Sequence, residues 1–75
     1  MESTLILYPL KIFIGQQYIY IMELKYDKSA QEALDQIKSK DYSLPWSIDA
    51  RKIIEIGINF SSEKRRIDSW KVREV

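Results

Sequence analysis

The fold is decided by residues 18–26, which read Tyr-Ile-Tyr-Ile-Met-Glu-Leu-Lys-Tyr. Side chains alternate between the two faces of a strand, and both faces of this segment are largely apolar. Ile19 and Ile21 share one face, and the other face carries Tyr18, Tyr20, Met22 and Leu24. A strand that is apolar on both faces is typical of the interior of a sheet covered on both sides. We therefore predict a central strand here.

Two charged residues follow the isoleucines on the same face of this strand. Glu23 and Lys25 are separated by one residue, so the alternation puts their side chains next to each other at the rim of the sheet. A carboxylate and an ammonium group held together in this way can seat a divalent metal ion and a phosphate. The same pair can also form a surface salt bridge, worth about 0–1 kcal/mol when exposed. The pair alone leaves both interpretations open.

A helix is predicted from Ala30 to about Lys40. Ser29 precedes it as an N-cap, and Glu32 stands three positions later, which is the spacing of a capping box. An apolar stripe follows the i, i+3, i+4, i+7 pattern and consists of Ala30, Ala33, Leu34 and Ile37. This stripe predicts a helix that packs one face against a sheet.

Three further segments have the composition of strands. Residues 52–60 place Gly57 on one face, where glycine permits the close approach of another element, and the other face holds Ile54, Ile56, Ile58 and Phe60. Residues 67–72 are predicted to form a final strand. Residues 5–14 are apolar but contain Pro9, so they form an edge strand, a bulged strand or two short strands.

These elements predict a small α/β fold, a mixed β-sheet in the order β-β-α-β-β with one packed helix. The first two strands form an antiparallel hairpin, and the strand–helix–strand unit of residues 18–60 is parallel and right-handed. A chain of 75 residues holds a single domain, residues 1–75. One helix covers only one face of the sheet, so the other face needs a second layer. We expect either a homodimer or a chain that is a fragment of a larger domain.

The composition excludes several kinds of site. There is no cysteine and no histidine, which rules out disulfides, thiolate metal sites and imidazole bases. The net charge of +1 lacks the basic excess typical of nucleic-acid binders, and the densest basic spots, residues 51–52 and 64–66, are interpreted as solvated turns. The longest uncharged run, Ile12–Met22, is too short to span a bilayer, and the acidic start does not resemble a secretory signal. We expect a cytoplasmic protein.

Three blocks of the chain together resemble a known family. They are residues 18–27, 28–42 and 52–61, followed by Arg-Ile-Asp-Ser-Trp-Lys at residues 66–71. In this order they closely resemble the PD-(D/E)XK nuclease-like domain found behind a predicted AAA-ATPase module in many bacteria and archaea. The resemblance implies a restriction-endonuclease-like core and magnesium-dependent hydrolysis of DNA phosphodiester bonds. It also implies magnesium as the cofactor, with DNA and an AAA-ATPase module as partners.

The resemblance assigns a role to individual residues. Glu23 would bind magnesium with help from the backbone carbonyl of Leu24, and Lys25 would position or activate the attacking water. Gln36 would order the site, although its position also suits an ordinary half-buried helix residue. Tyr42 would correspond to the tyrosine of the family's helix motif, but five residues separate it from Gln36, whereas the commonest form of that motif has three.

One departure from the family bears directly on activity. The family carries an aspartate, a principal metal ligand, on the strand before the Glu-x-Lys strand, and the only acid upstream of Glu23 is Glu2. The helix that precedes the first strand in the family also has no counterpart. We therefore expect an N-terminally truncated core that is degenerate or incomplete as a nuclease. The alternative is a non-catalytic module for dimerisation or protein interaction.

Overall fold

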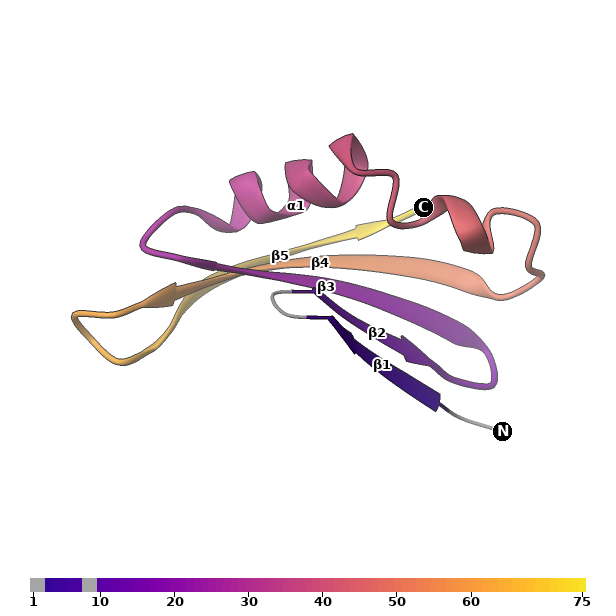
Figure 1. Cartoon of the computed structure of the whole chain (residues 1–75), viewed down its shortest axis with the longest axis horizontal. Coiled ribbons are helices and arrows are strands. Elements are labelled where there is room, and N and C mark those ends of the chain that lie inside the picture. Colours follow the sequence, from indigo (N-terminus) through magenta and orange to yellow (C-terminus); the bar gives the residue numbers. More distant parts are fainter. Residues whose placement is uncertain (1–2, 8–9) are drawn as a thin grey trace.

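Within residues 3–7 and 10–75, the chain forms one five-stranded sheet with a single α-helix on one of its faces (Figure 1). The computed structural model describes residues 3–7 and 10–75. In chain order the elements are β1 (Ser3–Leu7), β2 (Leu10–Ile14), β3 (Tyr18–Tyr26), α1 (Ala30–Ser39), the 3₁₀ helix η1 (Leu44–Trp46), β4 (Lys52–Ser61) and β5 (Arg66–Glu74). The small mixed α/β fold predicted from the sequence is confirmed.

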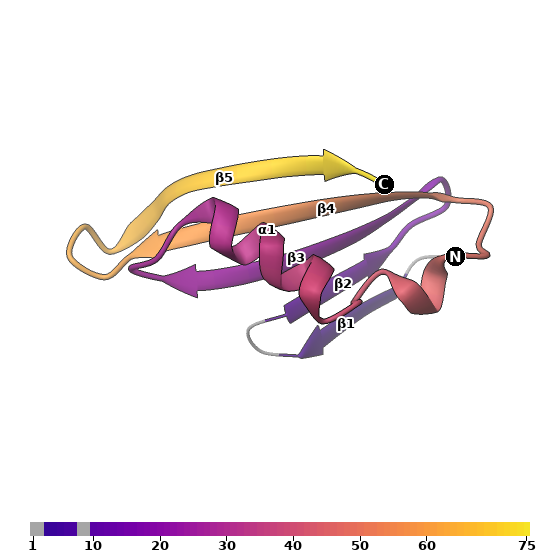
Figure 2. The same cartoon turned by 90° about the horizontal axis from the view of Figure 1, so that it is seen from above.

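The strands lie in the sheet in the same order as in the chain. β1, β2 and β3 form an antiparallel meander, β3 and β4 are parallel, and β5 returns antiparallel to β4. α1 lies in the connection between the two parallel strands, as the view from above shows (Figure 2). Of the interpretations left open for residues 5–14, two short strands is the observed one, which adds a strand to the predicted order. Tyr8 and Pro9 lie outside the described residues, as does Glu2.

The helix begins at the predicted cap. The Ser29 hydroxyl accepts a hydrogen bond from the Glu32 backbone N–H at 3.0 Å, which satisfies one of the free donors of the first turn. At the other end the Lys40 N–H donates to the Gln36 carbonyl at 3.0 Å. The buried residues of α1 are those of the predicted stripe: Ala30, Ala33, Leu34 and Ile37.

The core lies between α1 and the sheet. Its buried cluster consists of Leu10, Ile12, Ile19, Ile21, Leu34, Ile37 and Ile53. Gly57 lies in β4 directly beneath the helix, because a Cβ atom built on it would stand 2.3 Å from the Ala30 carbonyl oxygen and 2.7 Å from the Leu34 nitrogen. The close approach predicted at this glycine is therefore confirmed, and it fixes how deeply α1 sits on the sheet.

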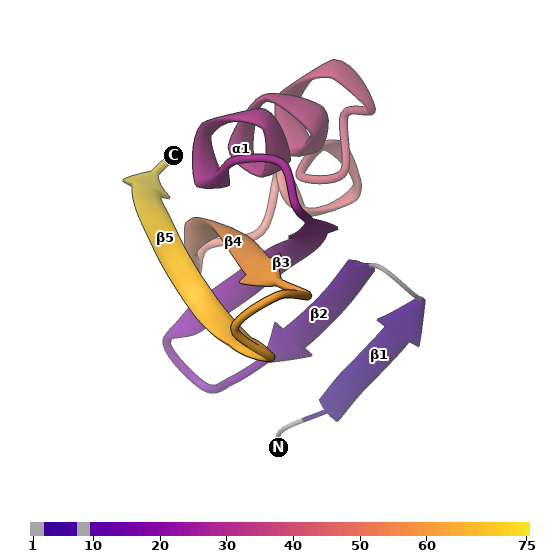
Figure 3. The ribbon, with the colours of Figure 1, turned by 90° about the vertical axis from the view of Figure 1, so that its left-hand side faces the viewer.

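The opposite face of the sheet carries no further layer within residues 10–75, and α1 lies on one side only in the end-on view (Figure 3). The alternation that buries Ile19 and Ile53 under α1 turns Tyr18, Trp70 and Val72 toward this uncovered side, where they are 37%, 66% and 58% exposed. Within the described part of the chain, no helix is long and apolar enough to cross a membrane.

Candidate functional site

Glu23 lies in the middle of the sheet, on the face that α1 covers. Its register partners are Leu10 on β2 and Gly57 on β4, and it is 0% exposed. Within residues 3–7 and 10–75, neither carboxylate oxygen has a hydrogen-bond partner. Burial raises the pKa of Glu23, and the positive charge of Lys25 opposes that rise in pKa only in part. A buried carboxyl without a partner is costly to a fold, so this residue stands out as a site candidate.

Lys25 connects β3 to the helix. Its ammonium group is half-buried and donates a hydrogen bond to Oε1 of Gln36, which comes from the second turn of α1. The sequence-predicted residues Glu23, Lys25 and Gln36 therefore lie on one side of the sheet, with Lys25 between an acid and an amide.

The other two residues suggested by the resemblance lie apart from this group. The side chain of Leu24 alternates to the opposite face of β3, so only its carbonyl could serve a metal ion. Tyr42 packs against the apolar core, and its backbone N–H donates to the Ile37 carbonyl at 3.1 Å. Tyr42 thus takes part in closing the end of α1 onto the core.

Asn59 is a residue of this region that the sequence reasoning did not single out. It is the register partner of Lys25 on β4 and is only 4% exposed. Its Oδ1 accepts a hydrogen bond from the Lys28 backbone N–H at 2.9 Å, in the short connection between β3 and α1. Asn59 therefore holds the start of α1 against the sheet beside Lys25. Its place on the Gly57 face of β4 was a signal that it points inward.

A second buried acid, Glu55, was also missed, and it lies on the same sheet face. Unlike Glu23 it is fully partnered: Arg73 donates to Oε1 from Nε at 2.8 Å and also from Nη2, and the Ser43 hydroxyl donates to Oε2 at 2.5 Å. Arg73 also reaches the Leu34 carbonyl at 3.4 Å. The cluster ties β4, β5, α1 and the following loop together, which is a structural role. Its signal was a charged residue between Ile53 and Gly57 on the inward face.

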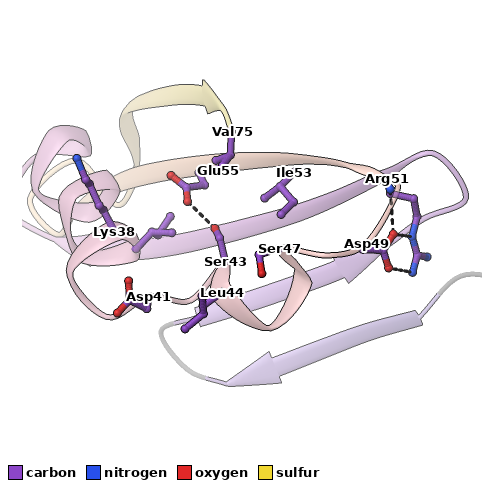
Figure 4. A pocket seen from close by; sticks show the side chains of 11 residues that line it. Lys38, Asp41, Ser43, Leu44, Ser47, Asp49, Arg51, Ile53, Glu55 and Val75 are labelled. Carbon is purple, nitrogen blue, oxygen red and sulfur yellow. Dashed lines mark hydrogen bonds and ion pairs between the residues drawn. The ribbon is translucent and has the colours of Figure 1, made fainter.

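A cavity of about 460 Å³ opens beside Glu55, between the end of α1, η1 and the start of β4 (Figure 4). Its lining contains none of Glu23, Lys25 or Gln36. Three of its five charged side chains are already paired: Arg51 donates to Asp49 at 2.7 Å and holds the pKa of that carboxyl at about 2, and Glu55 accepts from Arg73. This cavity is separate from the predicted chemistry and carries no buried group that lacks a partner.

The position across from Glu23 decides whether a metal can bind. That position on β2 is Leu10, an apolar residue that is 6% exposed. Magnesium takes oxygen ligands in octahedral geometry, usually from one or two carboxylates together with water and phosphate. The described residues contain no cluster of three or more acidic, histidine or cysteine side chains placed to hold a metal ion. A single, fully buried carboxylate with a leucine at the neighbouring position does not provide the ligands that a magnesium ion needs.

Comparison with models of known families identifies a family for this chain. A family model described as the PD-(D/E)XK nuclease superfamily matches residues 10–70, which include Leu10, Glu23, Lys25, Gln36 and Asn59. Neither the curated proteins nor the solved structures gave a match to the chain. The matched range covers most of the chain: it includes every element from β2 to β4 and the first part of β5. On this evidence, the chain belongs to the PD-(D/E)XK nuclease superfamily.

Proposed function

We propose that this chain is a nuclease-superfamily domain that keeps Glu23, Lys25 and Gln36 but does not hydrolyse DNA as a lone chain. The observation that carries this proposal is the pairing of Glu23 with Leu10, an apolar residue on the strand before the Glu-x-Lys strand, which is the strand on which the family carries its aspartate. The ancestral activity implied by the family is magnesium-dependent cleavage of DNA, and the geometry argues that this chain has lost the metal site.

The environment of Glu23 supports the same conclusion. The carboxyl is 0% exposed, and burial raises its pKa, so its charged form is disfavoured when no metal is bound. Magnesium dehydrates reluctantly and keeps several of its waters. A single carboxylate beneath a helix and beside a leucine offers neither the space nor the ligands for such an ion. Lys25 then has a structural task, holding α1 through Gln36.

The proposal is tested by restoring the acid. We expect the wild-type chain to leave supercoiled plasmid intact in magnesium or manganese, and we expect neither ion to raise its melting temperature. In Leu10→Asp, two carboxylates face each other, so magnesium should raise the melting temperature by relieving their repulsion. Leu10→Asn is the matched control, because it introduces the same shape without the charge and should show no such rise.

Glu23→Gln tests the opposite outcome. Plasmid cleavage by the wild-type chain that disappears in Glu23→Gln would refute the proposal, because it would show that the single acid suffices. A magnesium-dependent rise in the melting temperature of the wild type that is absent in Glu23→Gln would refute it too. Cleavage that survives in both Glu23→Gln and Lys25→Ala would indicate a contaminating nuclease.

A second candidate function is a non-catalytic interaction module, and the uncovered apolar face of the sheet favours it. The resemblance described above suggests an AAA-ATPase module as one partner of such a module. Binding of the purified chain to an ATPase encoded beside it, measured by calorimetry, would support this function. If the chain bound neither such an ATPase nor a second copy of itself, the interaction-module function would be refuted.

A further inference from the structure

The sheet face that points away from α1 is a continuous apolar surface, which we call the open face. The register places Tyr20, Met22, Ile56, Ile58, Trp70 and Val72 on it, from three neighbouring strands. Aromatic contacts stiffen it, with the rings of Tyr18 and Tyr20 6.0 Å apart and those of Tyr26 and Phe60 5.6 Å apart. Aromatic and aliphatic side chains without charges at the centre are typical of the core of a protein interface.

The open face has the size of a stable interface. Its most exposed members are Trp70 at 66%, Val72 at 58% and Ile67 at 52%, followed by Tyr26 at 43% and Tyr18 at 37%. Since aromatic side chains have about 150–250 Å² each, these five and their half-buried neighbours expose on the order of 800 Å². A standard protein interface buries about 800 Å² on each partner, so one copy of this face matches what a dimer needs.

The outer edge of the sheet is less suited to pairing than the open face. β5 is an edge strand of nine residues, and a long edge strand invites another strand to pair with it unless charges prevent this. Five charged residues occupy this strand: Arg66, Asp68, Lys71, Arg73 and Glu74. The apolar residues of β5, by contrast, are turned to the open face. A partner is therefore expected to stack on the face.

The charges at the rim of the open face are self-complementary. Lys11 stands at the β2 side, opposite Met22, and is exposed without an ion pair to any described residue. Glu74 stands at the β5 side, opposite Ile54, with only a long contact of 3.9 Å to Lys52. A two-fold axis parallel to the strands, between β3 and β4, lays β2 of one copy over β5 of the other. Lys11 of one copy then lies at the same height along the strands as Val72 of the other copy, close enough for its side chain to reach Glu74 of that copy.

We propose that the open face is the contact surface between two copies of this chain, stacked face to face about such an axis. The two sheets would pack about 10 Å apart, with Trp70 and Val72 of each copy against the sheet of the other. This inference does not depend on whether the chain has nuclease activity, because the open face lies on the opposite side of the sheet from Glu23.

The test is sedimentation equilibrium over a range of concentration, from well below micromolar to several hundred micromolar, because interfaces of this size range in affinity from about micromolar to picomolar. The wild-type chain should show a saturating monomer–dimer equilibrium. The double variant Trp70→Glu/Val72→Glu should weaken dimerisation at least tenfold. Ile48→Glu is the matched control: Ile48 is 97% exposed but lies in the loop before β4, away from the open face, so its dimer should be unchanged. Circular dichroism of each variant checks that the fold is retained.

A charge exchange tests the orientation. Lys11→Glu should weaken the dimer, and Lys11→Glu/Glu74→Lys should restore it, because the pair is rebuilt with its signs reversed. A chain that stays monomeric throughout, or that associates without limit, overturns the proposal. So does a dimer that the Trp70→Glu/Val72→Glu variant leaves intact. Failure of the charge exchange to restore the dimer overturns the two-fold arrangement.

Discussion

Replacing Gly57 by alanine tests the contact on which both the fold and the candidate site depend. Gly57 lies beside Glu23 in the register and beneath the first turns of α1. The added Cβ would stand 2.3 Å from the Ala30 carbonyl oxygen, whereas ordinary contacts begin near 3.4 Å. The two nearest atoms, the Ala30 carbonyl oxygen and the Leu34 nitrogen, belong to the helix backbone, so no side-chain rotation can relieve the clash. The whole helix must retreat from β4 by about 1 Å, and such a gap forfeits a quarter to a half of the dispersion attraction between the surfaces it separates.

The expected cost is large for a domain of this size. Overpacking of this kind costs about 1–3 kcal/mol, and contact with immovable backbone puts Gly57→Ala near 3 kcal/mol. A chain of 75 residues has a free energy of unfolding of about 4–11 kcal/mol. Because each kcal/mol shifts the melting temperature by about 4–8 °C in a small domain, we expect a fall of about 12–24 °C.

Thermal denaturation followed by circular dichroism at one fixed protein concentration measures this fall. Gly15→Ala is the matched control, because its Cβ would meet the Tyr18 carbonyl oxygen at 3.2 Å and a Phe13 ring carbon at 3.4 Å, which a small adjustment accommodates. We expect it to melt within a few degrees of the wild type, since its cost should stay within about 0.5 kcal/mol. If Gly57→Ala melted together with Gly15→Ala, the close packing of α1 on β4 inferred here would be wrong.

Two further predictions concern the buried acids. Glu23→Gln should stabilise the fold relative to the wild type, and increasingly so as pH rises above 4.5. In the wild type the pKa of Glu23 is higher in the folded protein than in the unfolded protein, so the unfolded protein loses this proton first. The stability of the wild type therefore falls with rising pH until the pKa of the folded protein is passed. Denaturant titrations of both proteins from pH 4 upward measure this, and a constant difference would contradict it. Arg73→Met should cost about 2 kcal/mol, because it leaves Glu55, whose side chain is 5% exposed, with Ser43 as its remaining partner. The double variant Glu55→Leu/Arg73→Met should regain most of that loss. If its cost instead equalled the sum of the costs of Glu55→Leu and Arg73→Met, the two residues would not act as a pair.

Local patterns were sufficient to predict the helix and the strands β3, β4 and β5, but not the division of residues 5–14 into two strands. The alternation in residues 18–26 and 52–60 predicted which side chains would share a face, and the Ser29 cap predicted where the helix would begin. These features are encoded within a few residues of the chain, so they can be read without knowing the rest of the structure.

The unpredicted features depend on contacts between distant segments. Leu10 faces Glu23 only because the turn after β2 sets the hairpin register, and a shift of one residue would have turned Leu10 to the other face. The partnership of Glu55 with Arg73 requires β5 to be placed beside β4, and that of Asn59 with Lys28 requires the turn into α1. The alternation of residues 52–60 indicated only that Glu55 and Asn59 share the face of Gly57.

The two buried acids of the sheet distinguish a structural charge from a site. Both lie on the face beneath α1, and both are almost completely removed from water. Glu55 follows the rule for buried polar groups, because an arginine and a hydroxyl compensate its lost hydration. Glu23 does not follow it, because its neighbours in the register are a leucine and a glycine. Stability alone gives no reason for a carboxyl at that position, whereas descent from a metal site does. Under the proposed function, the unpartnered acid is what remains of a metal site, and Leu10 is the position that no longer supplies a second carboxylate.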